Sequence, residues 1–412
     1  MRILLTTFGS YGDLFPYLAL GRELHRRGHE VTVATSAVYQ SKVAAVGLGF
    51  RPVRPDVSLD DREMLAYVMD AQRGSERVVR YLASVVRESY EDTLDAASWA
   101  DLIVTHPITF ASVVAAQQLR KRWVSSILAP ISFLSIYDPP VVAPAPWMRR
   151  LNFLGPNFAR MWISLGKRQG FDWVRAVFDL RAELGLGPSA NPLFEGQHSP
   201  ALVIALFSPL LAAPQPDWPS HTIVTGFCFF EDGTLSDELQ NFLDSGSPPV
   251  VFTLGSSAVG TAGDFYRHSL NAIQRLGVRA VLLTGSHPQG LPETLPDHIL
   301  RASYAPHAEL FPRAAAIVHQ GGIGTTAQAL RAGRPMLIVP FAHDQFDNAE
   351  RVRRLAAAEV LPRSRYTGQR AEGRLRLLMS RPSYAEATAR AGGQVRAEDG
   401  TRVAADAIER MR

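Results

Sequence analysis

The sequence predicts an α/β protein of two Rossmann-like domains that face each other across a cleft. In residues 1–128, short apolar runs alternate with longer amphipathic stretches, the pattern of a parallel sheet wrapped by helices. The same alternation restarts at residue 250, after a segment rich in proline and glycine. A length of 412 residues fits two domains, each with its own core.

The first domain begins with a strand at Ile3–Thr7 and a helix at Leu14–Arg27. We expect Asp13 to be the N-cap of that helix, with Pro16 tolerated in its first turn. The strand Val31–Thr35 follows. The pattern then predicts a long helix at 77–98, a strand at 101–105, a helix at 110–119 and a strand at 124–128.

The second domain repeats this organisation. The pattern predicts strands at 250–254, 279–283, 315–318 and 336–339, with a helix at 264–276. The proline-rich and glycine-rich segment 212–249 is expected to connect the domains, so we place the first domain at 1–215 and the second at 222–392. Apolar residues recur at helical spacing between 384 and 411, which indicates terminal helices.

Composition excludes several classes of protein. The single cysteine, Cys228, cannot form an internal disulfide, and this favours a reducing, cytoplasmic location. A formal net charge of +4 is too small to indicate a nucleic-acid partner. The N-terminal apolar run is too short for a signal peptide, and the apolar stretch 201–213 is too short for a membrane span and contains Pro209.

Three glycine-rich or serine-rich turns fall where a strand ends and a helix begins, at 9–12, 255–257 and 319–326. Helix N-termini of this kind attract anions, although glycine also occurs in such turns for steric reasons alone. The third turn has His319 at the strand end and two hydroxyls at the helix start, without the lysine of a P-loop. It predicts a diphosphate held by the helix, the hydroxyls and His319, with no metal required.

Three further polar residues are candidates for chemistry. Asp344 and Gln345 follow the strand 336–339, and a carboxylate beside an amide suits vicinal hydroxyls such as those of a sugar. Helix capping by Asp344 is the simpler alternative. Asp13 is open to two interpretations, a helix cap or a general base at the mouth of the cleft.

The stretch 130–160 combines six prolines with aromatic residues and reads as an insertion made of loops. It predicts a surface that binds a flat or hydrophobic acceptor. The alternative is that these residues only pack within the domain. Peripheral contact with a membrane is also left open, and the oligomeric state is not predicted.

The motifs resemble those of a known family. The stretch 7–16, with Gly9, Gly12, Asp13 and Pro16, is similar to the opening of bacterial and sterol-type nucleotide-sugar glycosyltransferases. The stretches 304–307, 319–326, 333–335 and 340–345 resemble the donor-binding signature of the same UDP-glycosyltransferase-like family. This resemblance spans both halves and implies the GT-B fold, with the helix at about 395–412 packing back on the first domain. Smaller stretches at 217–219, 237–243 and 343–351 look closest to the rhamnosyltransferase chain of rhamnolipid synthesis.

The resemblance also implies roles for individual residues. Asp13 takes the place of the catalytic histidine of many relatives, and the stretch 105–107 offers no carboxylate to orient it, so a base without a partner is expected, with His106 as a weaker second candidate. Tyr304 stands where plant relatives stack a tryptophan on the base. The implied donor site consists of Ser257, Tyr304, Ala305, His319, Gly321, Gly322, Gly324, Thr325, Gln328, Asp344 and Gln345.

These residues imply an inverting, metal-independent hexosyltransferase that uses a nucleotide sugar as co-substrate and no cofactor. The donor is a UDP-sugar or a dTDP-sugar such as UDP-glucose or dTDP-rhamnose, and the acceptor is a hydroxyl of a phenolic natural product or a lipid. A non-catalytic, hydrolytic or epimerising protein of the same fold is the alternative. A dinucleotide-dependent oxidoreductase is disfavoured, because the first turn lacks the G-x-G-x-x-G spacing.

Overall fold

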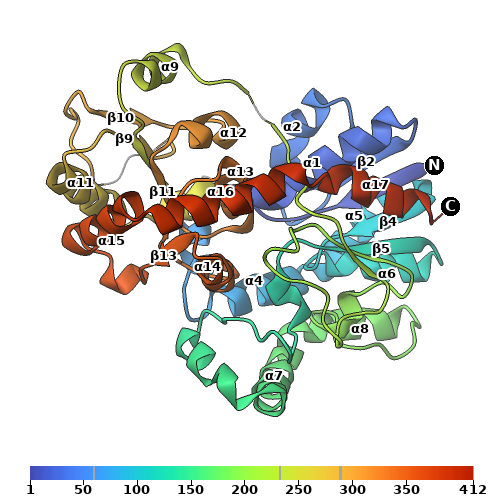
Figure 1. The fold of residues 1–412 in the computed structure, drawn as a ribbon. Helices are drawn as coiled ribbons and strands as arrows, with labels where there is room; N and C mark the ends of the chain where they lie inside the picture. The colour runs from blue at the N-terminus through green and yellow to red at the C-terminus, as the bar shows by residue number, and fades with distance from the viewer. Residues whose placement is uncertain (59–60, 232, 287–289, 412) are drawn as a thin grey trace.

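Two parallel sheets form the centres of two lobes (Figure 1). The computed structural model describes residues 1–58, 61–231, 233–286 and 290–411. Within these residues the first sheet has the order β3-β2-β1-β4-β5-β6-β7 and the second β10-β9-β8-β11-β12-β13. The strands of the first sheet are β1 (Arg2–Thr6), β2 (Glu30–Thr35), β3 (Gly49–Pro52), β4 (Leu102–Thr105), β5 (Arg122–Ile127), β6 (Val203–Ala205) and β7 (Thr222–Val224). Those of the second are β8 (Val250–Thr253), β9 (Ala280–Leu283), β10 (Ile299–Ala302), β11 (Ala316–His319), β12 (Met336–Ile338) and β13 (Ala358–Val360).

Helices connect the strands and cover the sheets. In the first lobe they are α1 (Tyr11–Arg26), α2 (Gln40–Ala45), α3 (Arg62–Val68), α4 (Gly74–Ser84), α5 (Val86–Trp99), α6 (Phe110–Gln118), α7 (Pro156–Phe171) and α8 (Arg175–Glu183). The remaining helices are α9 (Asp237–Asp244), α10 (Gly255–Ala258), α11 (Phe265–Leu276), α12 (His307–Leu310), α13 (Ile323–Ala332), α14 (Gln345–Arg354), α15 (Gly368–Ser380), α16 (Pro382–Ala397) and α17 (Gly400–Glu409). Short 3₁₀ turns include η2 (Pro130–Phe133) and η3 (Pro146–Leu154).

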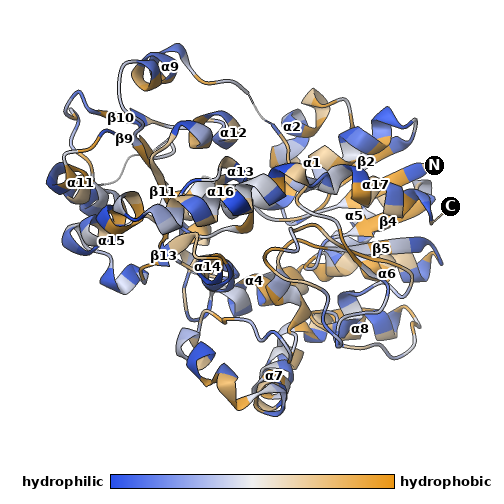
Figure 2. Ribbon diagram, in the orientation of Figure 1, coloured by the Kyte–Doolittle hydropathy of each residue, from blue (hydrophilic) through white to orange (hydrophobic). Residues whose placement is uncertain are grey.

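The inner strands form because their residues are apolar on both faces. In β4, β8 and β11 every residue is buried, as expected of a parallel sheet with helices on either side. The helices are amphipathic: Figure 2 shows hydrophobic and hydrophilic residues mixed along them. The predicted α/β architecture of two facing domains is confirmed.

The start of the first helix differs from the prediction. Ser10, not Asp13, is the N-cap of α1, and Asp13 is the third helical residue of a capping box. The helix therefore begins earlier than expected, and Pro16 lies beyond its first turn. The prediction of Asp13 as the cap is wrong because the Ser10 hydroxyl already accepts the hydrogen bond from the Gly12 N–H.

Two further expectations need correction. The helix predicted at 77–98 is divided into α4 and α5 at Val85, next to Ser84, whose hydroxyl donates to the Tyr81 carbonyl and competes with the helical hydrogen bonds. The boundary between the domains also shifts. Residues 222–224, placed in the second domain, form β7, the edge strand of the first sheet, because they pair with β6.

The segment 130–160 is more helical than expected. Pro130, Pro146 and Pro156 each stand at the start of a helical turn, in η2, η3 and α7. Proline is tolerated there because the N–H groups of the first turn have no acceptor within the helix, so its missing N–H costs no hydrogen bond. Among the described residues, no helix is long and apolar enough to cross a membrane.

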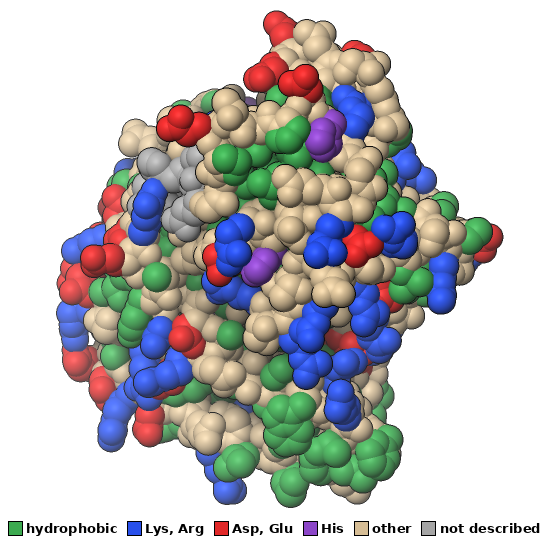
Figure 3. Space-filling model, turned by 90° about the vertical axis from the view of Figure 1, so that its left-hand side faces the viewer, with side chains coloured by type: hydrophobic (Ala, Val, Ile, Leu, Met, Phe, Trp, Pro, Cys, Tyr) green, Lys and Arg blue, Asp and Glu red, His purple; other side chains and the backbone are tan. Residues whose placement is uncertain are grey.

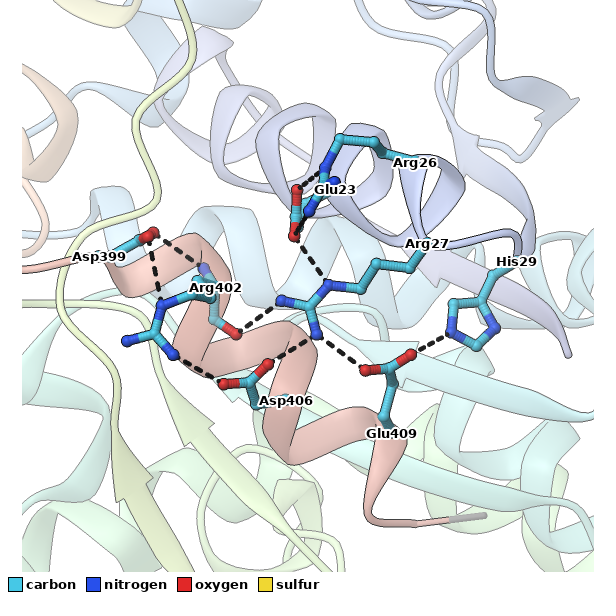
Figure 4. A network of polar contacts seen from close by, with 8 residues as sticks. All are labelled: Glu23, Arg26, Arg27, His29, Asp399, Arg402, Asp406 and Glu409. Carbon is cyan, nitrogen blue, oxygen red and sulfur yellow. Dashed lines mark hydrogen bonds and ion pairs between the residues drawn. The ribbon is translucent and has the colours of Figure 1, made fainter.

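The last two helices run from the second lobe onto the first (Figure 1). The alanines and Ile408 of α17 pack in the apolar cluster that contains α1 and β1. Beside this contact, Arg27 bonds Asp406 at 2.6 Å, Glu409 at 2.8 Å and Glu23 at 2.7 Å, as Figure 4 shows. The terminal helix is thus fixed to the first lobe by both apolar and charged contacts.

Candidate active site

In each sheet there is one position, the switch point, from which successive strands are added in opposite directions. The predicted site residues lie at or after the ends of the strands that flank the two switch points. In the first sheet the reversal lies between β1 and β4, which lead to Asp13 and His106. In the second it lies between β8 and β11, which lead to the turns at Ser257 and His319. Ligands of open α/β sheets bind at the carboxyl ends of strands at such switch points.

The two switch points face each other where the lobes meet. A Cβ atom placed on Gly324, in the first turn of α13, would lie 3.4 Å from the Cα of Gly12 in α1. A Cβ on Gly255 would lie 3.4 Å from the Thr325 hydroxyl, so the 255–257 turn adjoins the same helix start. The structure therefore brings together the three turns that the sequence singles out.

One carboxylate oxygen of Asp13 is hydrogen-bonded to Ser10, and the other lies next to His106. Its Oδ2 accepts hydrogen bonds from the Ser10 backbone N–H at 2.8 Å and the Ser10 hydroxyl at 3.2 Å. Its Oδ1 lies 3.5 Å from Nε2 of His106. The side chain of Asp13 is 32% exposed, whereas that of His106 is 6% exposed. The expectation of a base without a partner is therefore wrong, since β4 delivers a histidine beside it.

The turn before α1 leaves no room for a side chain at Gly9. Gly9 has φ +134°, and a Cβ there would overlap the Asp13 carboxylate. The Tyr39 hydroxyl donates to the Gly9 carbonyl at 2.7 Å. Glycine is required here both for its backbone conformation and for the close approach of Asp13.

His319 is fully buried at the end of β11. Its Nδ1 accepts a hydrogen bond from the Gly321 N–H at 3.1 Å, so Nε2 carries the proton. That Nε2 atom has no hydrogen-bond partner among the described residues. Burial lowers the pKa of His319 to about 3, and the imidazole is neutral near neutral pH. It can therefore offer one N–H to an incoming anion.

Asp344 occupies the N-cap position of α14, yet its side chain makes no capping bond. It instead accepts a hydrogen bond from the Asn348 amide at 2.7 Å. Burial raises the pKa of the Asp344 carboxyl to about 7, and the charge of Asp13 adds to this effect. The simpler interpretation of the Asp344 carboxylate as a helix cap is wrong, because no backbone N–H of α14 donates to its side chain.

Gln345 and the glycine turn support each other. The side-chain oxygen of Gln345, Oε1, accepts hydrogen bonds from the backbone N–H groups of Phe341 and Ala342, at 2.8 and 3.1 Å. A Cβ on Gly321, which has φ +90°, would lie 2.9 Å from the Gln345 carbonyl oxygen of the backbone. The side-chain oxygen of Gln345 is thus bonded to the turn at 341–342, and the NH₂ group is the part of the side chain that can contact a ligand.

The other predicted donor residues differ in their surroundings. Ser257 is half-buried, Tyr304 is 53% exposed and Ala305 is buried. Gln328, on α13, lines a cavity of about 240 Å³ with Arg331 and Arg396, and this lining does not include His319 or Tyr304. Its predicted place beside the nucleotide thus remains a prediction. Within the described ranges, no group of three or more His, Cys, Asp or Glu could hold a metal ion.

His343 is a residue that sequence reasoning missed. It precedes Asp344 with φ +55°, an uncommon conformation for a residue other than glycine, and such strain gathers at functional sites. Its Nδ1 lies 3.3 Å from the Ser75 hydroxyl of α4, and the charge of Asp13 acts on its pKa, which burial lowers. The residue therefore joins the two lobes beside the site. Its sequence position gave no signal, because backbone strain is visible only in three dimensions.

An ion network, buried at Arg351 and Asp347, connects the 130–154 segment to α14. Arg351 bonds Asp347 at 2.7 Å and also pairs with Asp138. Asp347 in turn accepts the Val141 N–H at 3.0 Å. Arg149 of η3 pairs with Glu350 at 2.8 Å. These contacts tie the loop that follows β5 to the helix that carries Asp344.

Two family models match the chain. The N-terminal domain of glycosyltransferase family 28 matches residues 3–125. The C-terminal domain of erythromycin biosynthesis protein CIII-like proteins matches residues 268–409. The first match extends from β1 into β5 of the first sheet, and the second includes β9 to β13 of the second sheet.

Individual proteins are similar over almost the whole chain. O-mycaminosyltylonolide 6-deoxyallosyltransferase of Streptomyces fradiae is 33% identical, over 99% of this chain and 97% of that protein. Sterol 3-beta-glucosyltransferase of Candida albicans is 28% identical over 87% of this chain, which spans 24% of that longer protein. The structure of the glycosyltransferase VinC in complex with dTDP has a TM-score of 0.69 at 21% identity, and each chain is covered to 99%.

Proposed function

The chain belongs to the glycosyltransferases with the GT-B fold, and we propose that it transfers a hexose from a nucleoside diphosphate sugar to a hydroxyl of a hydrophobic acceptor, with inversion at the anomeric carbon. The observation that carries this proposal is the meeting of the two switch points. Gly12, the neighbour of Asp13 in the first lobe, adjoins Gly324 at the start of α13 in the second lobe, and the charge of Asp13 acts on Asp344 of the second lobe.

In this proposal Asp13 is the general base. Its Oδ2 is anchored by Ser10, and Oδ1 accepts the proton of the acceptor hydroxyl as that oxygen attacks the anomeric carbon. His106 touches Oδ1 and acts as a positioning residue that keeps the carboxylate turned toward the cleft. Its Nδ1 accepts the Ile108 N–H at 3.4 Å, which directs the Nε2 proton at Asp13.

The leaving diphosphate is bound by the second lobe. The bond between the anomeric carbon and the diphosphate oxygen breaks, and the electron pair leaves with the nucleoside diphosphate. The N-terminus of α13 and the free Nε2–H of His319 stabilise that developing charge, with Ser257 and Thr325 beside them. A base on one lobe and a leaving group on the other suit displacement from opposite sides of the carbon, and this supports inversion.

The sugar and the nucleoside have separate contacts. Asp344 accepts and the Gln345 NH₂ group donates hydrogen bonds to sugar hydroxyls, since both follow β12 at the same end of the sheet. Tyr304 stacks on the nucleobase, and the backbone of Ala305 reads its edge. The similarity to a 6-deoxyallosyltransferase supports a 6-deoxyhexose as the transferred sugar.

A direct test is nucleotide binding followed by turnover. UDP and dTDP are compared with GDP, NADH and coenzyme A for the thermal stabilisation of the purified protein. We expect UDP or dTDP alone to raise Tm, and the responding nucleotide then defines the donor for screening macrolide, phenolic and lipid hydroxyls by mass spectrometry. Stabilisation by NADH or coenzyme A alone would contradict the proposal, as would release of free sugar that no acceptor suppresses.

A further inference from the structure

Exposed apolar side chains are concentrated in one part of the first lobe. Of the eleven large hydrophobic residues that the described chain exposes, six lie in η3 and α7 or at the end of α7. They are Trp147, Phe153, Leu154, Met161, Leu165 and Phe171, with exposed fractions between 49% and 80%. We call these six side chains, with the basic residues between them, the η3–α7 surface.

Helix α7 is apolar on two opposite faces. Ala159 and Ile163 are buried against the lobe, as expected of a surface helix. At 100° per residue, Met161 and Leu165 point to the opposite side, where polar residues normally stand, and Arg168 lies next to Met161 on that side. Packing within the chain explains the first face and leaves the second without a partner among the described residues.

The surface is also basic. Residues 144–171 contain five Lys or Arg and no Asp or Glu, although the whole chain has a formal net charge of only +4. Arg149 and Lys167 pair with Glu350 and Glu195. Arg150 and Arg168 are exposed and form no ion pair with any residue that the structure describes. The residues that the structure describes therefore neutralise the positive charge of this region only in part.

The shape of the region is convex. Figure 1 shows η3 and α7 projecting from the lower end of the molecule, away from both sheets. At that end Figure 3 shows hydrophobic side chains side by side with basic ones near them and acidic ones absent from the cluster. A projecting apolar tip with a basic surround differs from a ligand cavity, which is concave.

We propose that the η3–α7 surface binds an anionic lipid bilayer, with the apolar side chains entering the headgroup boundary and the arginines contacting lipid phosphates. An interfacial helix has this composition, and its binding sums buried apolar area and attraction to anionic lipids. At 16 residues α7 is too short to span the bilayer and lies along it. A second copy of the chain is disfavoured as the occupant, because a symmetric contact would bring the same unneutralised arginines together.

The tie between η3 and α14 gives this surface a place relative to the reaction. Arg149 of η3 bonds Glu350 of the helix that carries Asp344. A bilayer on the η3–α7 surface would therefore lie on the side of the first lobe that contacts α14. The docking itself does not depend on the proposed transfer reaction, and its test requires no substrate.

Flotation with vesicles tests the proposal. Vesicles of phosphatidylcholine alone are compared with vesicles that also contain phosphatidylglycerol, at low and high salt. We expect the full-length protein to float with the anionic vesicles, and the bound fraction to fall as salt rises. The triple variant Phe153→Ser, Met161→Ser, Leu165→Ser should lower the partition coefficient about tenfold or more, since three apolar contacts are lost.

Two further variants separate charge from apolar area and from general surface change. Arg150→Glu with Arg168→Glu should abolish the preference for anionic vesicles. Val38→Ser with Met379→Ser, which also removes two exposed apolar side chains, should leave binding unchanged. Tm and nucleotide-induced stabilisation of every variant report folding, because all these residues are exposed.

The proposal is overturned if the protein does not bind anionic vesicles, or if the triple variant binds them as the unmodified protein does. It is also overturned if light scattering shows a dimer that the triple variant converts to a monomer, because the surface would then be an interface between copies. Capture of an acidic soluble protein in place of vesicles would likewise assign the surface to a protein partner.

Discussion

The Oδ1 atom of Asp13 lies 3.5 Å from the Nε2 atom of His106, so the carboxylate after β1 and the imidazole after β4 form a pair near the point where α1 meets α13. Of the two side chains the carboxylate, 32% exposed, is the member that a substrate can reach. The histidine, 6% exposed, is in the position to orient it.

Asp13→Asn should abolish sugar transfer and leave donor binding intact. The amide keeps the shape of the side chain but cannot take a proton, so kcat should fall by about 10²–10⁴-fold. Tm shifts with UDP or dTDP should be unchanged, because Asp13 belongs to the opposite lobe from the proposed diphosphate contacts. Transfer by this variant at more than a tenth of the normal rate would contradict the role of Asp13 as base.

His106→Ala and His106→Gln distinguish positioning from packing. Without a donor toward Oδ1, the alanine variant should lose roughly tenfold in kcat with little change in the donor KM. Glutamine can again present an N–H to Asp13, so it should recover most of the rate. If both variants lose kcat equally, the imidazole serves another purpose, such as packing against Tyr17, whose ring centroid lies 6.0 Å away.

His319→Phe should weaken nucleotide binding. The phenyl ring fills the buried space but lacks the Nε2–H, and one hydrogen bond to a charged group contributes about 1.5–3 kcal/mol, or roughly 10- to 100-fold in Kd. Calorimetric titration with UDP or dTDP measures the loss. Because burial holds the pKa of His319 at about 3, the free protein should show no titration of this residue between pH 5 and 8. Equal affinity in the variant would remove His319 from the diphosphate site.

Arg27→Met should loosen the contact between α17 and the first lobe. The side chain is 15% exposed and bonds three carboxylates, which would repel one another without it. A thermal scan should show a clear drop in Tm. Arg26→Met is the matched control, since Arg26 is 70% exposed and, among the described residues, pairs with Glu23 alone, and such surface pairs contribute about 1 kcal/mol or less.

This difference between the two variants should depend on pH. His29 and Arg27 hold the pKa of Glu409 below its ordinary value. A carboxyl of this kind stabilises the fold above its unfolded pKa of about 4.3 and loses that contribution as the pH falls further. The destabilisation by Arg27→Met should thus be full at neutral pH and shrink in acid; a constant difference down to acid pH would contradict the charged contact.

The inner strands could be predicted from the sequence and the edge strands could not. The buried strands β1, β4, β8 and β11 read as continuous apolar runs, and each was expected within two residues of its observed bounds. The edge strand β7 has three residues, none of them fully buried, and carries no such signal. It exists because β6 offers it hydrogen bonds, which is a tertiary effect.

The sequence predicted which turns carry the site residues, but not which of these residues contact each other. Local chemistry singled out the turns of Asp13 and His319 and the residues Asp344 and Gln345. The contact between Asp13 and His106 depends on β1 lying next to β4, residues that are far apart in the chain. The strained backbone of His343 likewise follows from tertiary packing. So does the hydrogen bond from Asn348 that the Asp344 side chain accepts in place of a capping bond.

Asp344→Asn should stabilise the free protein in a pH-dependent way and weaken donor binding. Burial raises the pKa of Asp344 to about 7 from an ordinary value near 3.9, so its charged form is disfavoured in the folded state. For a raised pKa, the stability is complete below the unfolded value and is lost as the pH rises through the folded value. The unmodified protein therefore carries this cost at pH 8 and not at pH 4.

The asparagine variant removes that cost, so its Tm relative to the unmodified protein should rise between pH 4 and pH 8. The exposed Asp297→Asn is the control and should show no such trend. If Asp344 also accepts a hydrogen bond from the donor sugar, the variant should raise the KM for the nucleotide sugar by about tenfold while binding of the free nucleotide diphosphate stays the same. A gain in stability without a change in KM would retain Asp344 as a buried acid and exclude it from sugar recognition.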